Sequence, residues 1–172
     1  MSQHSVQDQA NMDALTLRDG VAADLPELVI LLADDALGAF REQTSDEGLE
    51  VYQQAMSEIL AQQGNRVLVA ELHGKIVGCL QLTVIPGLAH RGARRGQIES
   101  VRIASHLRGH GLGEVMMRQA IEIARQAGCR IVQLTTDRTR ADAHRFYQRL
   151  GFQVTHMGLK LELVAEGTGP RA

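Results

Sequence analysis

Residues 98–113 of the chain read IESVRIASHLRGHGLG and run directly into an apolar-periodic segment. The stretch begins as an apolar strand and ends in a turn whose glycines, Gly109, Gly111 and Gly113, allow positive φ and close approach of the backbone to a ligand. A helix that follows such a turn leaves its first amide groups without intrahelical acceptors, which favours an anion at that point. Arg108 adds a charged donor suited to phosphate oxygens. The pattern predicts a pocket for phosphate or pyrophosphate.

Taken alone, these glycines are equally compatible with a tight strand-to-helix turn that binds nothing. Two well-known phosphate motifs fit poorly. The turn lacks the Gly-Lys-Ser/Thr ending of a nucleotide P-loop, and its last glycine spacing is too short for a dinucleotide fingerprint. The rest of the chain has to decide between a ligand site and a simple turn.

The composition is that of a globular chain, with 172 residues, 44% hydrophobic residues and a formal net charge of −2. This length suits one domain. The chain has neither a basic stripe nor interleaved aromatic residues, so nucleic acid is not expected as the primary partner. No apolar run approaches the roughly 20 residues of a membrane span, and the polar start lacks a signal-peptide core. We therefore expect a cytoplasmic protein without membrane contact.

Capping and turn signals divide the chain into alternating elements. Residues 1–13 are polar and aperiodic and are expected to form a mobile tail, residues 14–164 the domain, and residues 165–172 a frayed tail. The predicted elements are a strand at 15–17, helices at 24–38 and 44–64, strands at 66–72, 75–85 and 97–103, a helix at 112–127, a strand at 131–136, a helix at 139–150 and a hairpin of 152–155 with 159–164. The strand, helix, strand order after residue 97 implies a parallel pair, with a ligand crevice at the carboxyl ends of its strands.

Two segments are open to more than one interpretation. Residues 88–96 contain glycines and four basic side chains, His90, Arg91, Arg94 and Arg95, and are expected to form a solvated basic loop. The alternative is that this loop forms an anion-binding lip for the acceptor. Cys79 and Cys129 show no metal or redox spacing, and we expect buried small hydrophobic residues rather than a disulfide.

Two motifs, in this order, resemble those of the GNAT (GCN5-related N-acetyltransferase) superfamily. Residues 98–103 leading into Arg108 to Gly113 are similar to its acyl-CoA pyrophosphate signature, and residues 143–152, AHRFYQRLGF, look like its C-terminal tyrosine segment. The resemblance spans most of the chain. It implies an α/β fold: a single domain with a mixed, mostly antiparallel central sheet flanked by helices. In that fold the parallel strands 97–103 and 131–136 splay apart to form the acyl-CoA cleft.

The resemblance also implies a function, namely transfer of an acetyl group from acetyl-CoA to a primary amine of a small molecule by direct attack in a ternary complex. Backbone groups of Val101, Arg102 and Ile103 would hold the pantetheine and acetyl group. The pyrophosphate would lie beside Arg108 on the amides of the turn, which are those of Gly109, His110, Gly111, Leu112, Gly113 and Glu114.

The chain departs from the family pattern at two positions. Arg140 stands where an asparagine often lies seven residues before the tyrosine, so this arginine either meets a CoA phosphate or is simply solvated. Ser105 stands where a proline usually precedes the glycine turn. No metal is expected, because His106 and His110 lie in a turn and not on one helix face.

Acetyl transfer to an amine requires a base and an acid. An alkylammonium has a pKa of about 10.4, so a group must take its proton at neutral pH, and Glu99 matches the position of the family's basic carboxylate. Glu99 lies two residues before Val101, which predicts that both lie on one face of the strand. A structural carboxylate paired with an arginine is the alternative role for Glu99, and the rival bases are His90, Asp34 and Asp35. Tyr147 is the candidate acid for the leaving thiolate, against the alternative of a core aromatic residue.

The acceptor amine is the least determined part. Residues 142–147 are similar to the same run in aminoalkylphosphonate acetyltransferases, and the arginines of residues 91–95 suit an acidic acceptor, but Asp34 and Asp35 equally suit a cationic one. A homodimer is compatible with the resemblance. Two rival functions are a non-catalytic acyl-CoA-binding module and a dinucleotide-binding oxidoreductase with Asp137 as its ribose-binding acid. The glycine spacing and the late position of this unit disfavour the oxidoreductase.

Overall fold

The computed structural model describes residues 3–34, 42 and 46–163. Its contacts group the chain into two compact units, Met1–Leu134 and Thr135–Ala172. The elements are α1 (Gln3–Ala14), β1 (Thr16–Asp19), the 3₁₀ turn η1 (Ala22–Asp24), α2 (Leu25–Ala33), α3 (Asp46–Ala61), β2 (Asn65–Leu72), β3 (Lys75–Ile85), α4 (Ala89–Gly92), β4 (Arg94–Ile103), the 3₁₀ turn η2 (Ser105–Leu107), α5 (Leu112–Gln126), β5 (Cys129–Leu134) and α6 (Ala141–Arg149). The expected frayed tail at 165–172 lies outside the described residues.

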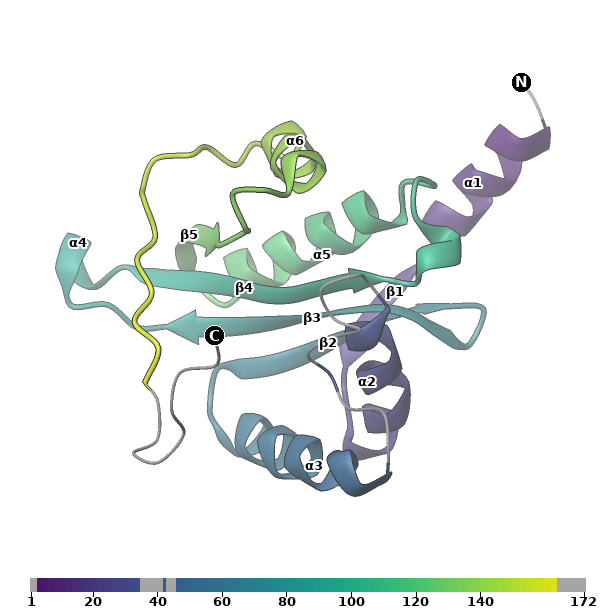
Figure 1. Ribbon diagram of the computed structural model, residues 1–172. Helices are drawn as coiled ribbons and strands as arrows, with labels where there is room; N and C mark the ends of the chain where they lie inside the picture. The colour runs from purple at the N-terminus through teal and green to yellow at the C-terminus, as the bar shows by residue number, and fades with distance from the viewer. Residues whose placement is uncertain (1–2, 35–41, 43–45, 164–172) are drawn as a thin grey trace. The chain divides into compact units, whose positions relative to one another are not determined.

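The first unit is built on one five-stranded sheet in the order β1-β2-β3-β4-β5 (Figure 1). Strands β1 to β4 pair antiparallel, and β5 pairs parallel with β4. The β2-β3 hairpin turns at His73 and Gly74, which both have positive φ, as the sequence predicts for a tight turn. The expected fold class, an α/β fold with a mixed and mostly antiparallel sheet, is confirmed.

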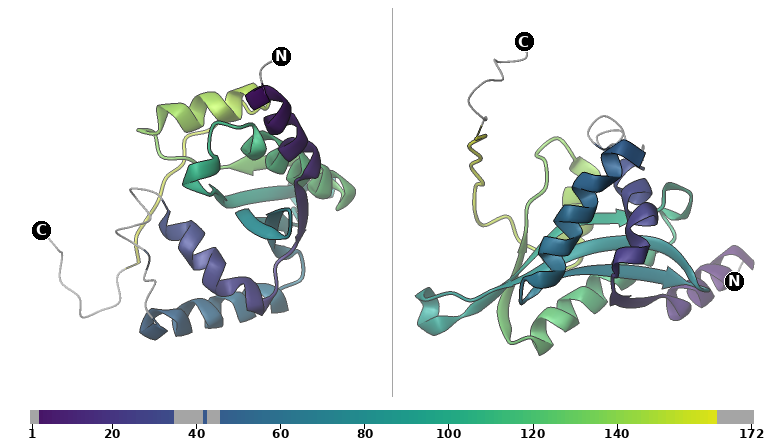
Figure 2. Two further views of the ribbon diagram at one scale, coloured as in Figure 1. Left: turned by 90° about the vertical axis from the view of Figure 1, so that its right-hand side faces the viewer. Right: turned by 90° about the horizontal axis from the view of Figure 1, so that it is seen from below.

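Helices cover both faces of this sheet, with α5 on one face and α2 and α3 on the other (Figures 1 and 2). The apolar stripe of α5 is buried through Leu112, Met116, Met117, Ala120 and Ala124. Glycines in the sheet make room for this helix: a Cβ built on Gly96 would lie 3.2 Å from the Cβ of Ala124. This close approach holds the last turns of α5 against the start of β4.

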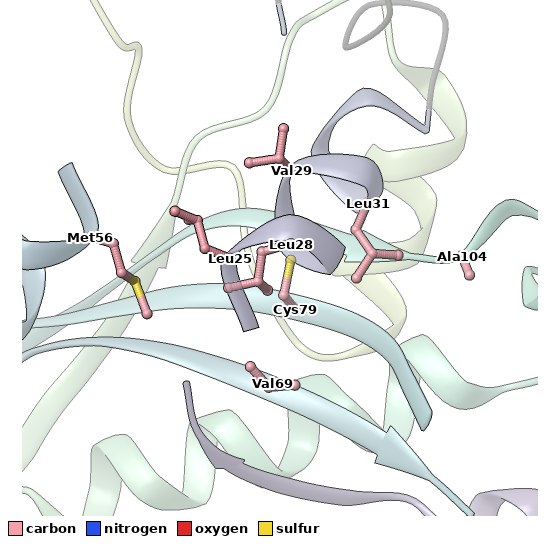
Figure 3. Close-up of a cluster of buried hydrophobic side chains, with 8 residues drawn as sticks. All are labelled: Leu25, Leu28, Val29, Leu31, Met56, Val69, Cys79 and Ala104. Carbon is pink, nitrogen blue, oxygen red and sulfur yellow. The ribbon is translucent and has the colours of Figure 1, made fainter. Parts of the chain in front are cut away.

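The opposite face carries a second buried cluster (Figure 3). It joins α2 and α3 to the sheet through Leu25, Leu28, Val29, Leu31, Met56, Val69, Cys79 and Ala104. Burial raises the pKa of the Cys79 thiol to about 12, so the group is a neutral, unreactive part of the core. Cys79 and Cys129 are both free thiols, and the partly buried Cys129 also has a raised pKa because of desolvation.

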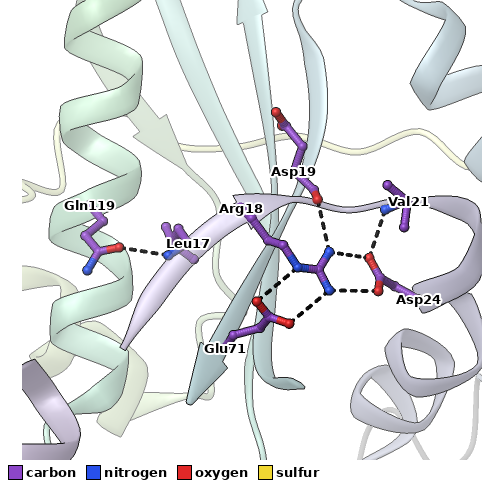
Figure 4. A network of polar contacts seen from close by, with 7 residues as sticks. All are labelled: Leu17, Arg18, Asp19, Val21, Asp24, Glu71 and Gln119. Carbon is purple, nitrogen blue, oxygen red and sulfur yellow. Dashed lines mark hydrogen bonds and ion pairs between the residues drawn. The ribbon is translucent and has the colours of Figure 1, made fainter. Parts of the chain in front are cut away.

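A polar network closes the sheet at β1 (Figure 4). Arg18 donates to both carboxylate oxygens of the buried Asp24, at 2.6 and 2.9 Å, and also to Glu71 at 3.2 Å. The Asp24 carboxylate accepts in addition the amide of Val21 at 2.8 Å. These bonds satisfy the one buried charge that is found in the described core, and they fix the start of α2 against β1 and β2.

The start of the chain differs from its sequence-based expectation. Residues 3–14 form the helix α1, where the sequence predicted a tail without regular structure. The helix has no continuous apolar stripe: Gln7 donates to Asn11 at 3.0 Å and Gln9 to Asp13 at 2.9 Å, each four residues apart, and Met12 packs on the turn at Gly111. A search for apolar periodicity does not detect a helix that lacks an apolar stripe.

The end of the chain also differs. Residues 152–163 form no strand, so the predicted hairpin of 152–155 with 159–164 is not found in the part of it that the structure describes. The alternating side chains Leu159, Leu161 and Leu163 are 86–91% exposed. Alternation is typical of a half-buried strand, but a strand forms only when a partner strand pairs with it. No helix among the described residues is long and apolar enough to cross a membrane.

Candidate functional site

Strand β4 contains an irregularity at the residues that the sequence singled out. Glu99 pairs with Gln81 of β3, whereas Arg102 pairs with Cys79, so three steps along β4 match two steps along β3. Ser100 absorbs the extra residue with a φ of 53°. This is the geometry of a β-bulge, which leaves one residue unpaired and changes which side chains share a face.

The bulge corrects one prediction. Residues that pair across antiparallel strands point to the same face, so Glu99 and Arg102 share the face of Gln81 and Cys79. Val101, next to Arg102, lies on the opposite face, and the predicted shared face of Glu99 and Val101 is wrong. Glu99 is exposed and lies on the sheet face that α2 and α3 cover.

The two parallel strands separate just before this point. The register of β4 with β5 runs from Arg94 to Ile98, where it ends opposite Leu134, while β4 itself continues to Ile103. The last five residues of β4 therefore lie beyond its ladder with β5. The carbonyls of Val101 and Ile103 accept side-chain hydrogen bonds from Arg102 at 3.0 Å and from Arg108 at 2.9 Å. A carbonyl oxygen has a second lone pair, so both groups can still accept from a ligand.

The glycine turn connects this strand end to α5. Gly109 and Gly111 have φ of 86° and 81°, and Gly111 is the N-cap of α5. A Cβ at Gly109 would meet nothing within 4 Å, so open space lies above the turn at that residue. The first amides of the 15-residue helix α5 have no intrahelical acceptors, and the helix dipole adds partial positive charge there. The turn thus has donors for an anionic group and is open at Gly109, whereas Met12 of α1 lies over Gly111.

Two contacts connect the turn to distant parts of the chain, and no local sequence pattern indicates either. Asp34, at the end of α2, accepts the amide of Ser105 at 2.6 Å and forms an ion pair with Arg108 at 3.7 Å. On the other side, His110 Nδ1 lies 2.9 Å from the carboxylate of Asp8 on α1. Both partners lie more than 70 residues away in sequence, beyond the reach of any local pattern.

The rival bases are poorly suited to that role. The pKa of Asp34 is lowered, first by the hydrogen bond from the Ser105 amide, so this carboxylate binds a proton weakly. Asp35 lies outside the described residues. His90 belongs to the turn before β4, and the ten residues of β4, at about 3.3 Å each, put its two ends about 30 Å apart.

The basic residues of segment 88–96, His90 among them, lie in α4 and at the start of β4. Arg94 and Arg95 are the first residues of β4 and not part of a loop, and Arg94 donates to the carbonyl of Ala127 at 3.1 Å. Figure 1 shows α4 and the glycine turn at opposite ends of the sheet. The predicted loop at 88–96 is therefore shorter, and it does not form a lip beside the turn.

Tyr147 belongs to the second unit, on α6. Its ring is half-buried and makes edge-on contacts with Phe146 and Phe152, with ring centroids 5.2 and 5.9 Å away. These neighbours hold the ring in place on the helix. Glu99 lies in the first unit, so the acid and base predicted from the sequence come from different units of the chain.

Asp137 and Arg140 mark the start of the same helix. Asp137 accepts the amide and hydroxyl of Thr139, at 2.8 and 2.6 Å, and the hydroxyl bond is the first cause of its lowered pKa. This local turn accounts for an acid at that position without a ribose. Arg140 is the exposed N-cap of α6. Among the described residues, no three His, Cys, Asp or Glu side chains are grouped to hold a metal ion.

The family model of the acetyltransferase (GNAT) family matches residues 29–152 of this chain, which include β4, the glycine turn and Tyr147. The chain belongs to the GNAT acetyltransferase family. The resemblance stated from two motifs is thereby confirmed. Members of this family use acetyl-CoA as their cosubstrate, which agrees with the anion-binding character of the turn.

Curated relatives of this GNAT chain are N-acetyltransferases. It is 36% identical over 84 residues to the aminoalkylphosphonate N-acetyltransferase of Salmonella typhimurium, and the aligned region covers 49% of this chain and 54% of that protein. It is 33% identical over 90 residues to the glucosamine 6-phosphate N-acetyltransferase of Trypanosoma brucei brucei, and the aligned region covers 52% of this chain and 59% of that protein. The chain therefore spans little more than half the length of these relatives.

Solved structures support the GNAT fold over a larger share of the chain. A Bacillus halodurans protein described as a transcriptional regulator has a TM-score of 0.82 at 42% identity and covers 87% of this chain and 99% of its own. A putative acetyltransferase from Agrobacterium tumefaciens has a TM-score of 0.75 at 32% identity, with coverages of 86% and 99%. A Clostridium acetobutylicum protein solved with acetyl-CoA has a TM-score of 0.66 at 19% identity, covering 86% and 96%, and supports the fold alone.

Proposed function

We propose that the chain transfers an acetyl group from acetyl-CoA to a primary amine of a small molecule by direct attack in a ternary complex. The observation that carries this proposal is the glycine turn at the start of α5, which follows the part of β4 that lies beyond its ladder with β5. The family to which the chain belongs supports the same reaction. In this proposal acetyl-CoA is the cosubstrate and the protein is cytoplasmic.

The cosubstrate would use both features of the turn region. The amides of residues 109–114, with Arg108 beside them, would bind the pyrophosphate, because helix N-termini and charged donors favour phosphate oxygens. The backbone of Val101, Arg102 and Ile103, beyond the β5 ladder, would pair with the pantetheine arm. Arg140 would contact a CoA phosphate. The open space above Gly109 supports access of the backbone to a bulky anion.

Two side chains would move protons. Glu99 would accept the proton of the ammonium group, directly or through water, so that the free amine can attack the thioester carbonyl. As the new C–N bond forms and the C–S bond breaks, Tyr147 would donate its phenolic proton to the leaving thiolate, and the excess proton on the new amide nitrogen would return to the phenolate, directly or through water. A phenol with a pKa near 10 is protonated at neutral pH and is suited to this step. No covalent intermediate with the protein is required.

The first experiment is calorimetric titration of the full chain with acetyl-CoA, with NAD as the comparison ligand. The proposal expects saturable binding of acetyl-CoA at one site and none of NAD. Binding of NAD alone would favour an oxidoreductase. Release of free thiol is then measured with a panel of primary amines that includes 2-aminoethylphosphonate and glucosamine 6-phosphate. Saturation with acetyl-CoA but no thiol release with any amine would favour a binding module.

The acid role is tested by Tyr147→Phe. This variant keeps the ring contacts with Phe146 and Phe152 and removes only the hydroxyl. We expect turnover to fall by about a hundredfold or more at unchanged affinity for acetyl-CoA. Full turnover by this variant would remove Tyr147 from the chemistry and leave it as a packing residue.

A further inference from the structure

A cavity of about 160 Å³ lies between the helices α2 and α3 and the sheet. Its lining includes Leu28 and Leu32 of α2, Tyr52 and Ala55 of α3, and Gln81 and Ser100 of the sheet. The cavity adjoins the buried cluster of this face, which Figure 3 shows from close by. It belongs entirely to the first unit of the chain.

The two ends of the cavity differ in chemistry. The side chains that α2 and α3 contribute are aliphatic or methionine, with Tyr52 as the exception. The Tyr52 hydroxyl already donates to the Glu42 carboxylate at 2.8 Å. The polar groups Gln81 and Ser100 come from the sheet, so the cavity is apolar toward the helices and polar toward β4. None of the described lining residues carries a charge at neutral pH.

The polar end of the cavity adjoins the proposed base. Ser100 is the bulge residue that directly follows Glu99, and Gln81 is the cross-strand partner of Glu99. Glu99 therefore lies on the same face of the sheet as the cavity. An amine held at Glu99 would have apolar space on the same face of the sheet, in the cavity beneath α2 and α3.

We propose that this cavity binds the acceptor and selects a primary amine that carries an aryl or branched alkyl group about the size of a benzene ring. The inference rests on the proposed function, because it places the amine at Glu99 and the apolar group in the cavity. The volume supports the size: an apolar cavity of about 150 Å³ is large enough to take up benzene. The aliphatic lining supports an aryl or branched alkyl group, because burial of hydrocarbon surface against it is favourable.

The same lining disfavours a phosphonate or phosphate group in this cavity. Such a dianion loses its hydration on burial and needs cationic or multiple N–H donors in exchange. The described lining offers one amide side chain and one hydroxyl at its polar end. The acceptor would therefore differ from those named for the Salmonella and Trypanosoma relatives.

The proposal is tested with three primary amines that share an ethyl spacer: 2-phenylethylamine, ethylamine and 2-aminoethylphosphonate. Thiol release with saturating acetyl-CoA gives kcat/KM for each. We expect 2-phenylethylamine to exceed both others by about tenfold or more, because burial of one ring supplies a factor of that size. A preference for 2-aminoethylphosphonate over 2-phenylethylamine would overturn the proposal.

A cavity-filling variant localises the effect. Ala55 lines the cavity but is itself exposed on α3, so Ala55→Trp adds a ring there without replacing a core side chain. Ala61→Trp, at the exposed end of the same helix and outside the lining, is the matched control. Ala55→Trp is expected to lower kcat/KM for 2-phenylethylamine about tenfold and to leave that for ethylamine within about twofold. Equal losses for both amines would contradict selection by the cavity.

A binding measurement separates failure of this inference from failure of the proposed reaction. The ¹⁹F NMR signal of 2-(4-fluorophenyl)ethylamine is titrated with the full chain in the absence of acetyl-CoA. The inference expects a saturable shift with the unchanged chain and with Ala61→Trp, and its loss with Ala55→Trp. If no amine is acetylated but this pattern appears, the reaction fails and the ligand class stands. If amines are acetylated but the pattern is absent, the ligand class fails and the reaction stands.

Discussion

The carboxylate of Asp34 accepts a hydrogen bond from the backbone amide of Ser105, with 2.6 Å between the nitrogen and the oxygen. Asp34 is the C-cap of α2, and Ser105 begins the short 3₁₀ turn between β4 and the glycine turn. Because α2 also lines the acceptor cavity, this bond connects the cavity wall to the proposed pyrophosphate site. One side chain thus joins the two halves of the proposed ternary complex.

The variant Asp34→Ala removes that connection. We expect the free energy of unfolding to fall by about 1 kcal/mol, because a charge-assisted hydrogen bond is lost at a partly exposed site. The KM for acetyl-CoA should rise several-fold, since the Ser105 amide loses its acceptor and Arg108 loses the carboxylate of its ion pair. Urea unfolding and steady-state kinetics measure the two effects. Asp13→Ala, at an exposed position on α1, is the control and should leave the KM unchanged.

A second prediction concerns acid stability and the Arg18–Asp24 pair. The Arg18 guanidinium lowers the pKa of the Asp24 carboxylate below the ordinary value of about 3.9 that applies in the unfolded chain. The unfolded state therefore binds more protons in this range, so stabilisation is complete above the ordinary value and is lost as pH falls through the folded pKa. Stability should decline from about pH 5 downward.

Asp24→Asn should remove that part of the pH dependence and cost about 2 kcal/mol at pH 7, because a nearly buried bidentate partner of Arg18 is lost. Asp19→Asn is the matched control: the Asp19 side chain also pairs with an arginine, Arg66, but is 61% exposed. Surface pairs contribute about 0–1 kcal/mol. Urea unfolding at several pH values compares the variants, and equal losses would show that burial of Asp24 is irrelevant.

A third prediction uses the close approach of β3 and β4. A Cβ on Gly78 would lie 2.7 Å from the carbonyl oxygen of Arg102, which is backbone and cannot move aside cheaply. Gly78→Ala should therefore destabilise the chain by about 2 kcal/mol through overpacking and shift the part of β4 proposed to hold pantetheine. Gly158→Ala, in open space without positive φ, should leave thermal unfolding unchanged. Stability of Gly78→Ala equal to that control would contradict the observed approach.

A fourth prediction concerns Glu99 as the base. Glu99→Gln should lower kcat about a hundredfold or more at pH 7 without changing affinity for acetyl-CoA. The defect should shrink as pH rises toward the pKa of the acceptor amine, because more amine is then free in solution and needs no base. A pH-rate profile of both proteins measures this. A defect that stays constant with pH would assign Glu99 a positioning role instead.

The elements near the turn were predictable because local chemistry encodes them. The glycines at 109 and 111 have the positive φ that the sequence implies, and α5 begins and ends close to its predicted limits. The bulge was missed because strict alternation was assumed through Glu99 and Val101. The sequence carries a sign of it: the apolar residues at 98, 101 and 103 are spaced by three and then by two.

Other features had no local sign. The helix α1 presents no apolar stripe, and its partner at the turn, His110, is 102 residues away from Asp8. At the other end, Leu159 and its alternating neighbours are typical of a strand but remain exposed. A sequence pattern shows which side chains of a segment would be buried in a helix or strand. Whether they are buried depends on the rest of the tertiary structure.

The extra residue in β4 makes this strand tolerant of a one-residue change in length at a single position. Ser100 changes which residues of β4 face α5. Before it, even-numbered residues such as Ile98 point toward α5, and after it odd-numbered residues such as Ile103 do. Deleting Ser100 alone would place Val101 opposite Leu80 and remove the bulge, so that Ile98, Val101 and Ile103 still point toward α5 while Glu99 and Arg102 keep the opposite face. Evolution or design can therefore shorten β4 by one residue at the bulge, whereas a shortening elsewhere that keeps the bulge has to come in steps of two.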